Sequence, residues 1–221
     1  MQQILQTREP NDSRPVVLLA ADEGRFGRLG QVMPAWCPPG IRPIVGQQIV
    51  REYIYAYAAV APELGKMTAL VLPYANTEMM NLFLSQVSQE FRDYFLIMQV
   101  DGAAWHSSKS LVIPENIRLI TQPAHSPELN PVEHLSTSAQ INGEPTTPLT
   151  RSVPEDIPIW VRRLFQPSSL WEEIRVHHFY NKVFDSIEAV MDNLCLGLNE
   201  LMAAPEKLRS MTYFPHLRIA I

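Results

Sequence analysis

The sequence lacks several features that define common classes of protein. It has only two cysteines, Cys37 and Cys195, and their wide separation shows no metal-binding spacing, so a reducing, cytoplasmic setting is the simplest interpretation. No apolar run approaches the roughly 20 residues that cross a bilayer, and residues 1–15 lack the apolar core of a secretory signal. A glycine-rich phosphate loop is also missing, which disfavours nucleotide hydrolysis.

The chain also has little positive charge. Its 221 residues carry a formal net charge of -5, with a pI near 5.7. A protein that binds nucleic acid by itself normally neutralises phosphates with an excess of Lys and Arg. Acidic residues gathered at a metal site would explain part of this deficit, because bound cations offset them.

The hydrophobic pattern predicts a mixed α/β domain with one sizeable core. Apolar or alternating runs predict strands, and one segment has helical spacing with Met79 and Met80 as core residues. The expected strands cover 16–21, 51–60, 66–72, 95–100 and 117–121, and the expected helix covers 76–91. The first three strands are expected to form an antiparallel meander.

Three acidic stretches stand out at the ends of these elements. Asp22 follows the first strand, Asp101 follows the strand at 95–100, and Glu133 lies at the start of another predicted helix. Acids at two strand ends and one helix start can converge on a single point. Converging carboxylates suit hard divalent cations, and two such ions about 4 Å apart can assist an in-line phosphoryl transfer.

Each acid also has a purely structural interpretation. Asp101-Gly102 is typical of a tight hairpin turn, although residues 103–110 lack the alternation of a returning strand. Asn130 can cap a helix that begins at Pro131, with Glu133 reaching back to the cap amide. Asp22-Glu23 could simply end a strand at a turn.

Taken together and in order, these motifs resemble the DDE transposases of bacterial insertion sequences, in the branch related to the Tc and mariner elements. The resemblance covers roughly residues 15–135 and 171–215. Its motifs are Asp22-Glu23 with Phe26-Gly27, Asp101-Gly102-Ala103 with Trp105-His106 and Ser108-Lys109, Ser126-Pro127-Glu128-Leu129-Asn130-Pro131 with Glu133-His134-Leu135, and, as closing helices, residues 171–175 and 179–184. The combination is specific, whereas any one motif alone is weak.

The resemblance implies a ribonuclease H-like mixed sheet flanked by helices. It further implies that Asp22, Asp101 and Glu133 hold two Mg²⁺ ions, with Mn²⁺ as a substitute, for cleavage and strand transfer at the ends of an insertion sequence. Element-end and target DNA would be the partners, alongside a homodimer or an upstream DNA-binding chain. His106, Lys109 and Arg25 are candidate contacts to DNA phosphate.

The chain departs from the family pattern after Leu135. The expected continuation of the Glu133 helix comes only at Trp171, and the segment 136–170 between them is rich in proline. Such a composition cannot continue a helix. We therefore expect residues 1–135 and 171–221 to form the catalytic domain, interrupted by a poorly ordered insertion. An insertion domain is the alternative interpretation of that segment.

Few residues precede the first strand, where family members carry DNA-binding domains. The sequence is therefore expected to represent a catalytic domain without its sequence-reading part. Two other functions stay open at this point. One is a catalytically inactive transposase remnant that acts at most as an interaction module, and the other is a nonspecific nuclease of the same fold.

Overall fold

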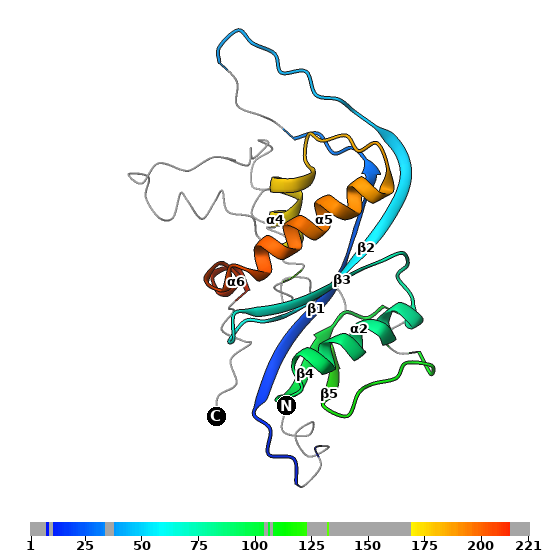
Figure 1. Cartoon of the computed structure of the whole chain (residues 1–221), viewed down its shortest axis with the longest axis vertical. Coiled ribbons are helices and arrows are strands. Elements are labelled where there is room, and N and C mark those ends of the chain that lie inside the picture. The colour runs from blue at the N-terminus through cyan, green and yellow to red at the C-terminus, as the bar shows by residue number, and fades with distance from the viewer. Residues whose placement is uncertain are drawn as a thin grey trace.

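A mixed five-stranded sheet with helices packed on both faces organises the protein (Figure 1). The computed structural model describes residues 8, 11–33, 38–103, 106, 108–122, 132 and 169–212. The strands are β1 (Val16–Leu29), β2 (Ile49–Ala61), β3 (Lys66–Leu72), β4 (Phe95–Val100) and β5 (Ile117–Thr121). The helices are α2 (Thr77–Glu90), α4 (Leu170–Ile174), its π-helical continuation η4 (Arg175–Phe179), α5 (Ile187–Met202) and α6 (Pro205–Thr212).

Strand β1 is the centre of the sheet, whose order is β3-β2-β1-β4-β5. Strands β1, β2 and β3 pair antiparallel, whereas β4 is parallel to both β1 and β5. The β4 ladder covers Val16 to Ala20 of β1, and the β2 ladder begins at Ala20 and runs to Leu29. The two ladders overlap only at Ala20, immediately before the first acidic motif.

The two faces of the sheet carry different helices. Odd-numbered residues at the start of β1, such as Leu19 and Ala21, join the apolar cluster that contains Phe83 of α2. Even-numbered residues, including Ala20 and Phe26, join a second cluster built from α4, η4, α5 and α6. This alternation is the period-two pattern of a strand that is buried on both faces. Residues 22 and 23 therefore point to opposite sides of the sheet.

Side-chain caps fix where the helices begin. The Asn76 side chain accepts a hydrogen bond from the Met79 amide at the start of α2, at 2.9 Å. Ser169 and Ser186 cap α4 and α5 in the same way. Each cap satisfies one of the backbone donors that a helix N-terminus leaves unpaired. The start of α4 at Ser169 sets the position of Trp171, which is central to the site below.

Most of the predicted fold is confirmed. The α/β class and the ribonuclease H-like sheet flanked by helices are observed, and the predicted strands from residue 51 to residue 121 match within two residues at each end. The hairpin interpretation of Asp101-Gly102 is wrong, because β4 runs parallel to the strand that follows it. Within the described residues, no helix is long and apolar enough to cross a membrane.

Two predictions need correction. The first strand does not end at residue 21: β1 continues to Leu29 because β2 pairs with it throughout, so Asp22 lies inside a strand rather than at a turn. Residues 179–184 are not a closing helix, since η4 ends at Phe179 and Asn181 adopts a φ of 60°. The insertion at 136–170, apart from its last two residues, and the predicted Glu133 helix, apart from Val132, lie outside the described residues.

We predict that Gly24→Ala destabilises the domain. A Cβ atom at Gly24 would lie 2.8 Å from both the Phe26 and Trp171 rings, which closely cover this part of β1. Such overpacking costs about 1–3 kcal/mol of unfolding free energy, which chemical denaturation would measure. Gly102→Ala is the matched control, because nothing lies within 4 Å of its added Cβ. Equal stability of the two variants would contradict the close packing of Trp171 on β1.

Candidate active site

Asp22 lies in the middle of β1 and is buried, with 9% of its surface exposed. Its Oδ2 atom accepts a hydrogen bond of 2.8 Å from Nε1 of Trp171, and both groups are shielded from solvent. A buried carboxylate needs such donors, because burial without them strongly disfavours the charged form. Asp22 is therefore anchored on the sheet face that carries the C-terminal helices.

Trp171 is itself held by packing on three sides. It is the second residue of α4, and its ring meets the edge of Phe26 with centroids 5.8 Å apart. Gly24 lies directly beneath the indole, and Ile174 belongs to the same buried cluster. The indole has little freedom to move away from Asp22, so the hydrogen bond has a fixed direction.

Asp101 follows the last residue of β4, at the carboxyl end of a strand adjacent to β1. The parallel register pairs Ala20 with Gln99, and continuing it by two residues sets Asp22 beside Asp101. The Oδ1 atom of Asp101 accepts a hydrogen bond from the Ala103 amide at 2.9 Å and forms an ion pair with His106 Nδ1 at 2.8 Å. No hydrogen bond or ion pair reaches Oδ2 from the part of the chain that the structure describes.

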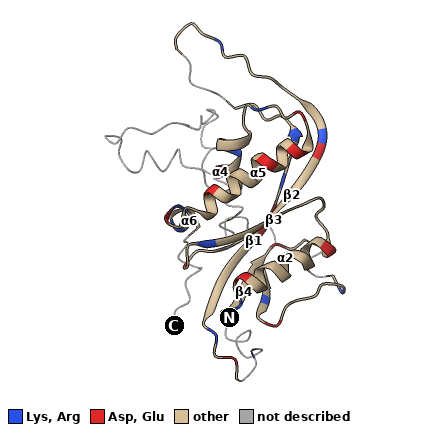
Figure 2. Cartoon of the chain, in the orientation of Figure 1, with Lys and Arg blue, Asp and Glu red and all other residues tan. Residues whose placement is uncertain are grey.

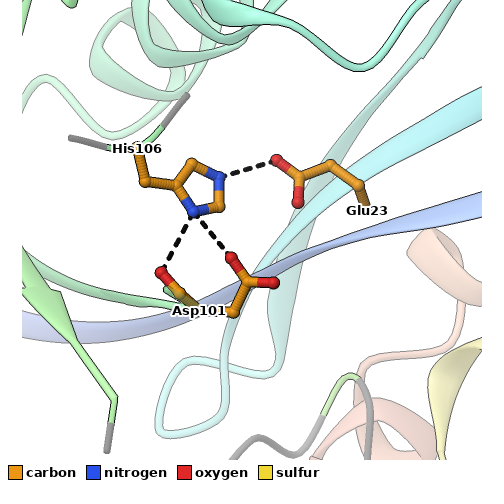
Figure 3. Close-up of side chains that lie close together, drawn as sticks. All are labelled: Glu23, Asp101 and His106. Atoms are coloured by element: carbon orange, nitrogen blue, oxygen red, sulfur yellow. Dashed lines mark hydrogen bonds and ion pairs between the residues drawn. The ribbon is translucent and has the colours of Figure 1, made fainter. Parts of the chain in front are cut away.

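His106 bridges Asp101 to a second carboxylate, Glu23 (Figure 3). Its Nε2 atom lies 2.9 Å from Glu23 Oε1, and the two side chains are only 3% and 8% exposed. Burial alone would lower the pKa of His106, but the hydrogen bonds to Asp101 and Glu23 outweigh it and raise the pKa to about 10. The same hydrogen bond from His106 lowers the pKa of Asp101. The imidazole is thus a cation between two carboxylates at neutral pH.

The site is therefore supported from both faces of the sheet. Trp171 holds Asp22 on one face, and by strand alternation Glu23 and the His106 bridge lie on the other, towards α2. Tyr57 pairs with Glu23 across β1 and β2, and burial followed by the Glu23 charge raises the pKa of its hydroxyl to about 12. Asp101 is supported from the His106 side.

The predicted site residues that the structure describes fall into three groups. Asp22 lies within β1, and Asp101 directly follows the neighbouring strand β4. His106 contacts Asp101 and Glu23, and both of its ring nitrogens face carboxylate oxygens. Arg25 and Lys109 are exposed, and the Arg25 guanidinium lies 4.7 Å from the centroid of the Tyr53 ring.

The third acid, Glu133, lies outside the described residues. Its neighbour Val132 is described and fully buried in the apolar cluster that also contains Trp171 and Phe26. That cluster covers the sheet face of Asp22. The chain therefore enters the Asp22 side of the sheet one residue before Glu133.

Sequence reasoning missed the roles of Glu23 and Trp171. The motif alone does not assign Glu23 a role, although strand alternation already predicts that it and Asp22 face opposite ways. The sequence predicts Trp171 only as part of a helix. Its contact with Asp22 spans 149 positions, and no local pattern reveals a contact at that separation.

The chemistry of these donors fits a hard divalent cation. Asp22 and Asp101 offer carboxylate oxygens, the ligands that Mg²⁺ and Mn²⁺ prefer. Glu23, Asp101 and His106 also place one potential ligand atom each within 4.8 Å of one another. In this arrangement, however, both ring nitrogens of His106 donate to carboxylate oxygens, so we interpret this second group as an ion-paired support for Asp101.

Residues 17–145, more than half of the chain, match the family described as DDE superfamily endonuclease. The chain belongs to this family, which places it among endonucleases that use a DDE catalytic domain. The DDE resemblance of the sequence motifs is thereby confirmed.

Other similarities are more distant. A protein of Sinorhizobium fredii, "uncharacterized protein y4pE/y4sA", is 28% identical over 160 residues, covering 72% of this chain and 93% of that protein. Among solved structures, the chain is similar to Mos1 transposase in a paired-end complex with the left transposon end, at 14% identity and a TM-score of 0.46. The match covers 94% of this chain and 59% of that one, so the chain spans about six-tenths of the Mos1 length. A pre-cleavage Mos1 transpososome matches at 14% identity and a TM-score of 0.47, covering 96% of this chain and 61% of that one.

We predict that His106 makes the stability of the domain depend on pH. Because its folded pKa is raised to about 10 from 6.5, its contribution is complete below about pH 6.5 and is lost as pH rises through 10. The difference in unfolding free energy between wild type and His106→Gln should therefore shrink from about 2 kcal/mol near pH 6 to little above pH 10. Urea denaturation in EDTA measures it. A difference that does not change over this range would contradict a charged His106.

Proposed function

We propose that this chain is the catalytic domain of a DDE transposase, which cleaves DNA strands and transfers them at the ends of an insertion sequence. The observation that carries the proposal is that Asp22 lies within β1 and Asp101 directly follows β4, the parallel strand beside it, while each carboxylate has a buried hydrogen-bonding partner. Membership in the endonuclease family supports the class of reaction. The proposed substrate is DNA.

Asp22, Asp101 and Glu133 would hold two Mg²⁺ ions, for which Mn²⁺ can substitute. Bound there, the metal would activate a water or a DNA 3′-hydroxyl for attack on a DNA phosphate, and it would neutralise negative charge on that phosphate. Support for Glu133 comes from Val132, which is buried on the face of Asp22. The Oδ2 atom of Asp101 supports its proposed role as a metal ligand. The described partners of Asp101 all contact Oδ1 or the backbone, so none of them competes with a cation for Oδ2.

The protein's own contribution is to fix the direction of two carboxylates before DNA arrives. Trp171 donates to one oxygen of Asp22. Ala103 and His106 donate to one oxygen of Asp101. Partners of this kind keep ligand oxygens in place, and removing one typically costs 10- to 100-fold in metal affinity or activity. In this scheme His106 positions Asp101 instead of contacting DNA phosphate.

The catalytic domain would comprise residues 1–135 and 171–221, with the segment 136–170 as an insertion. The packing of α4, η4, α5 and α6 on the β1 face supports this division, because Trp171 and Leu194 share one buried cluster with Phe26. The C-terminal helices are therefore part of the unit that positions Asp22. An upstream DNA-binding chain or a second copy would supply sequence recognition.

We predict that Asp22→Asn and Asp101→Asn each abolish Mg²⁺-dependent nicking of supercoiled plasmid by the full chain. Loss of a charged ligand should cost more than the 10- to 100-fold typical of a supporting residue. Asp93→Asn is the matched control, since Asp93 is an exposed acid in the turn after α2 and is 86% exposed. A folded wild type without any activity would instead favour the inactive remnant.

Trp171→Phe provides a graded test of positioning. Phenylalanine keeps the ring packed against Phe26 but removes the hydrogen bond to Asp22. We expect activity to fall about 10- to 100-fold, while thermal unfolding shows a fold that stays intact. The fall should be smaller with higher Mg²⁺ concentration, because the defect lies in holding a ligand. Wild-type activity would show that the hydrogen bond has only a structural role.

A further inference from the structure

A positively charged cleft lies along β1, beyond the acidic site. It has a volume of about 250 Å³ and is formed by the end of β1, Tyr53 of β2, Arg175 and Phe179 of η4, and the segment before α5. Figure 2 shows Lys and Arg at the end of β1 and on the neighbouring part of β2. The cations that line the cleft are Arg25, Arg28, Arg175 and Lys182. Such a concentration is unexpected in a chain of net charge -5.

Three of the four cations are not neutralised. Arg28 is engaged by the Glu52 carboxylate at 2.8 Å and by the Phe184 carbonyl at 2.9 Å. For Arg25, Arg175 and Lys182, no carboxylate lies within ion-pair distance in the described ranges, and Arg25 and Lys182 are exposed. The cleft therefore has a net positive charge that fits an anion.

Aromatic rings fix the two free guanidinium groups. The Arg25 group lies 4.7 Å from the centroid of Tyr53, and the Arg175 group lies 5.2 Å from that of Phe26. Stacking on a ring leaves the N–H edges of a guanidinium open, and these edges match the oxygens of a phosphate group. Pre-ordered arginines of this kind bind phosphate with little further loss of side-chain freedom.

One side chain connects the cleft to the residues that hold Asp22. Phe26 lines the cleft and also contacts Trp171, the hydrogen-bond partner of Asp22. Phe26, over which Arg175 is stacked, follows Asp22 by four strand positions on the same face of the sheet, which is about 13 Å at 3.3 Å per residue. This distance corresponds to about four rises of 3.4 Å along one DNA strand. One strand could thus contact both places at once.

We propose that Arg25, Arg175 and Lys182 bind the phosphate backbone of the DNA strand next to the phosphate that is cleaved. This inference rests on the proposed function for the identity of the anion, but the cleft itself does not depend on catalysis. It assigns the chain a DNA-binding surface of its own, despite its acidic composition. Binding there would be independent of base sequence, because phosphates carry no sequence information.

The test measures the binding of a labelled oligonucleotide duplex to the full chain without metal, in EDTA. Fluorescence anisotropy gives the binding constant K at each of a series of salt concentrations. For R25Q/R175Q/K182Q we expect the slope of log K against log salt to fall by about 2 to 3, at about 0.9 per lost phosphate contact. Lys66→Gln is the charge-matched control: Lys66 is exposed at the start of β3, paired with Ala61 at the opposite end of β2 from the cleft. An unchanged slope in the triple variant would overturn the proposal.

Two further variants separate the alternatives. R25K/R175K keeps both positive charges and should keep the salt slope of the wild type, so loss of that slope would indicate that the arginines have a structural role. K182Q alone changes an exposed residue and should lower the slope by about 1, even if the triple variant does not fold. Inorganic phosphate at the same phosphate concentration should not displace the duplex, and displacement would make the cleft a site for small anions. Asp101→Asn should bind DNA at least as well as wild type, so a protein inactive in nicking can still pass this test.

Discussion

A buried hydrogen bond from the Trp171 indole to the Asp22 carboxylate joins the central strand of the sheet to the C-terminal helices. Asp22 lies within the central strand, and its burial would be costly without a donor. The donor comes from a helix near the C-terminus, whose start is fixed by the Ser169 cap. The C-terminal helices cover the apolar face of β1, and the Trp171 indole of α4 also stabilises the Asp22 carboxylate on that face.

Asp101 is supported in a different way, by a charged imidazole on the opposite side. His106 joins Asp101 to Glu23, so a pair of adjacent acids on β1 serves two purposes. Asp22 faces the C-terminal helices as a candidate ligand, and Glu23 faces α2 as a support. Because strand alternation places Asp22 and Glu23 on opposite faces of the sheet, each can bind its own partner without bringing these two negative charges together.

The sequence predicted the parts of this arrangement that depend on local patterns. Hydrophobic periodicity located β3, α2, β4 and β5, and the order of motifs selected Asp22 and Asp101. It did not reveal that β1 continues through Gly24 and Gly27, because glycine is a poor strand former and the extension depends on pairing with β2. The contacts of Trp171 with Asp22 and of His106 with Glu23 join residues 149 and 83 positions apart, and such contacts follow from packing. The positive cleft was equally hidden, since Arg25 and Arg175 line one cleft only in the folded chain.

The central claim is that Asp22 and Asp101 act together on one cation, and Mn²⁺ binding followed by electron paramagnetic resonance tests it most directly. The affinity would be measured for wild type, Asp22→Asn, Asp101→Asn and the double variant, with Glu23→Gln for comparison. Shared ligands predict that the two single losses are strongly non-additive, since removing either carboxylate already disables the site. Glu23→Gln should weaken binding only through the positioning of Asp101. Unchanged affinity in Asp22→Asn together with complete loss in Glu23→Gln would contradict the account, and would move the metal to the group of Glu23, Asp101 and His106.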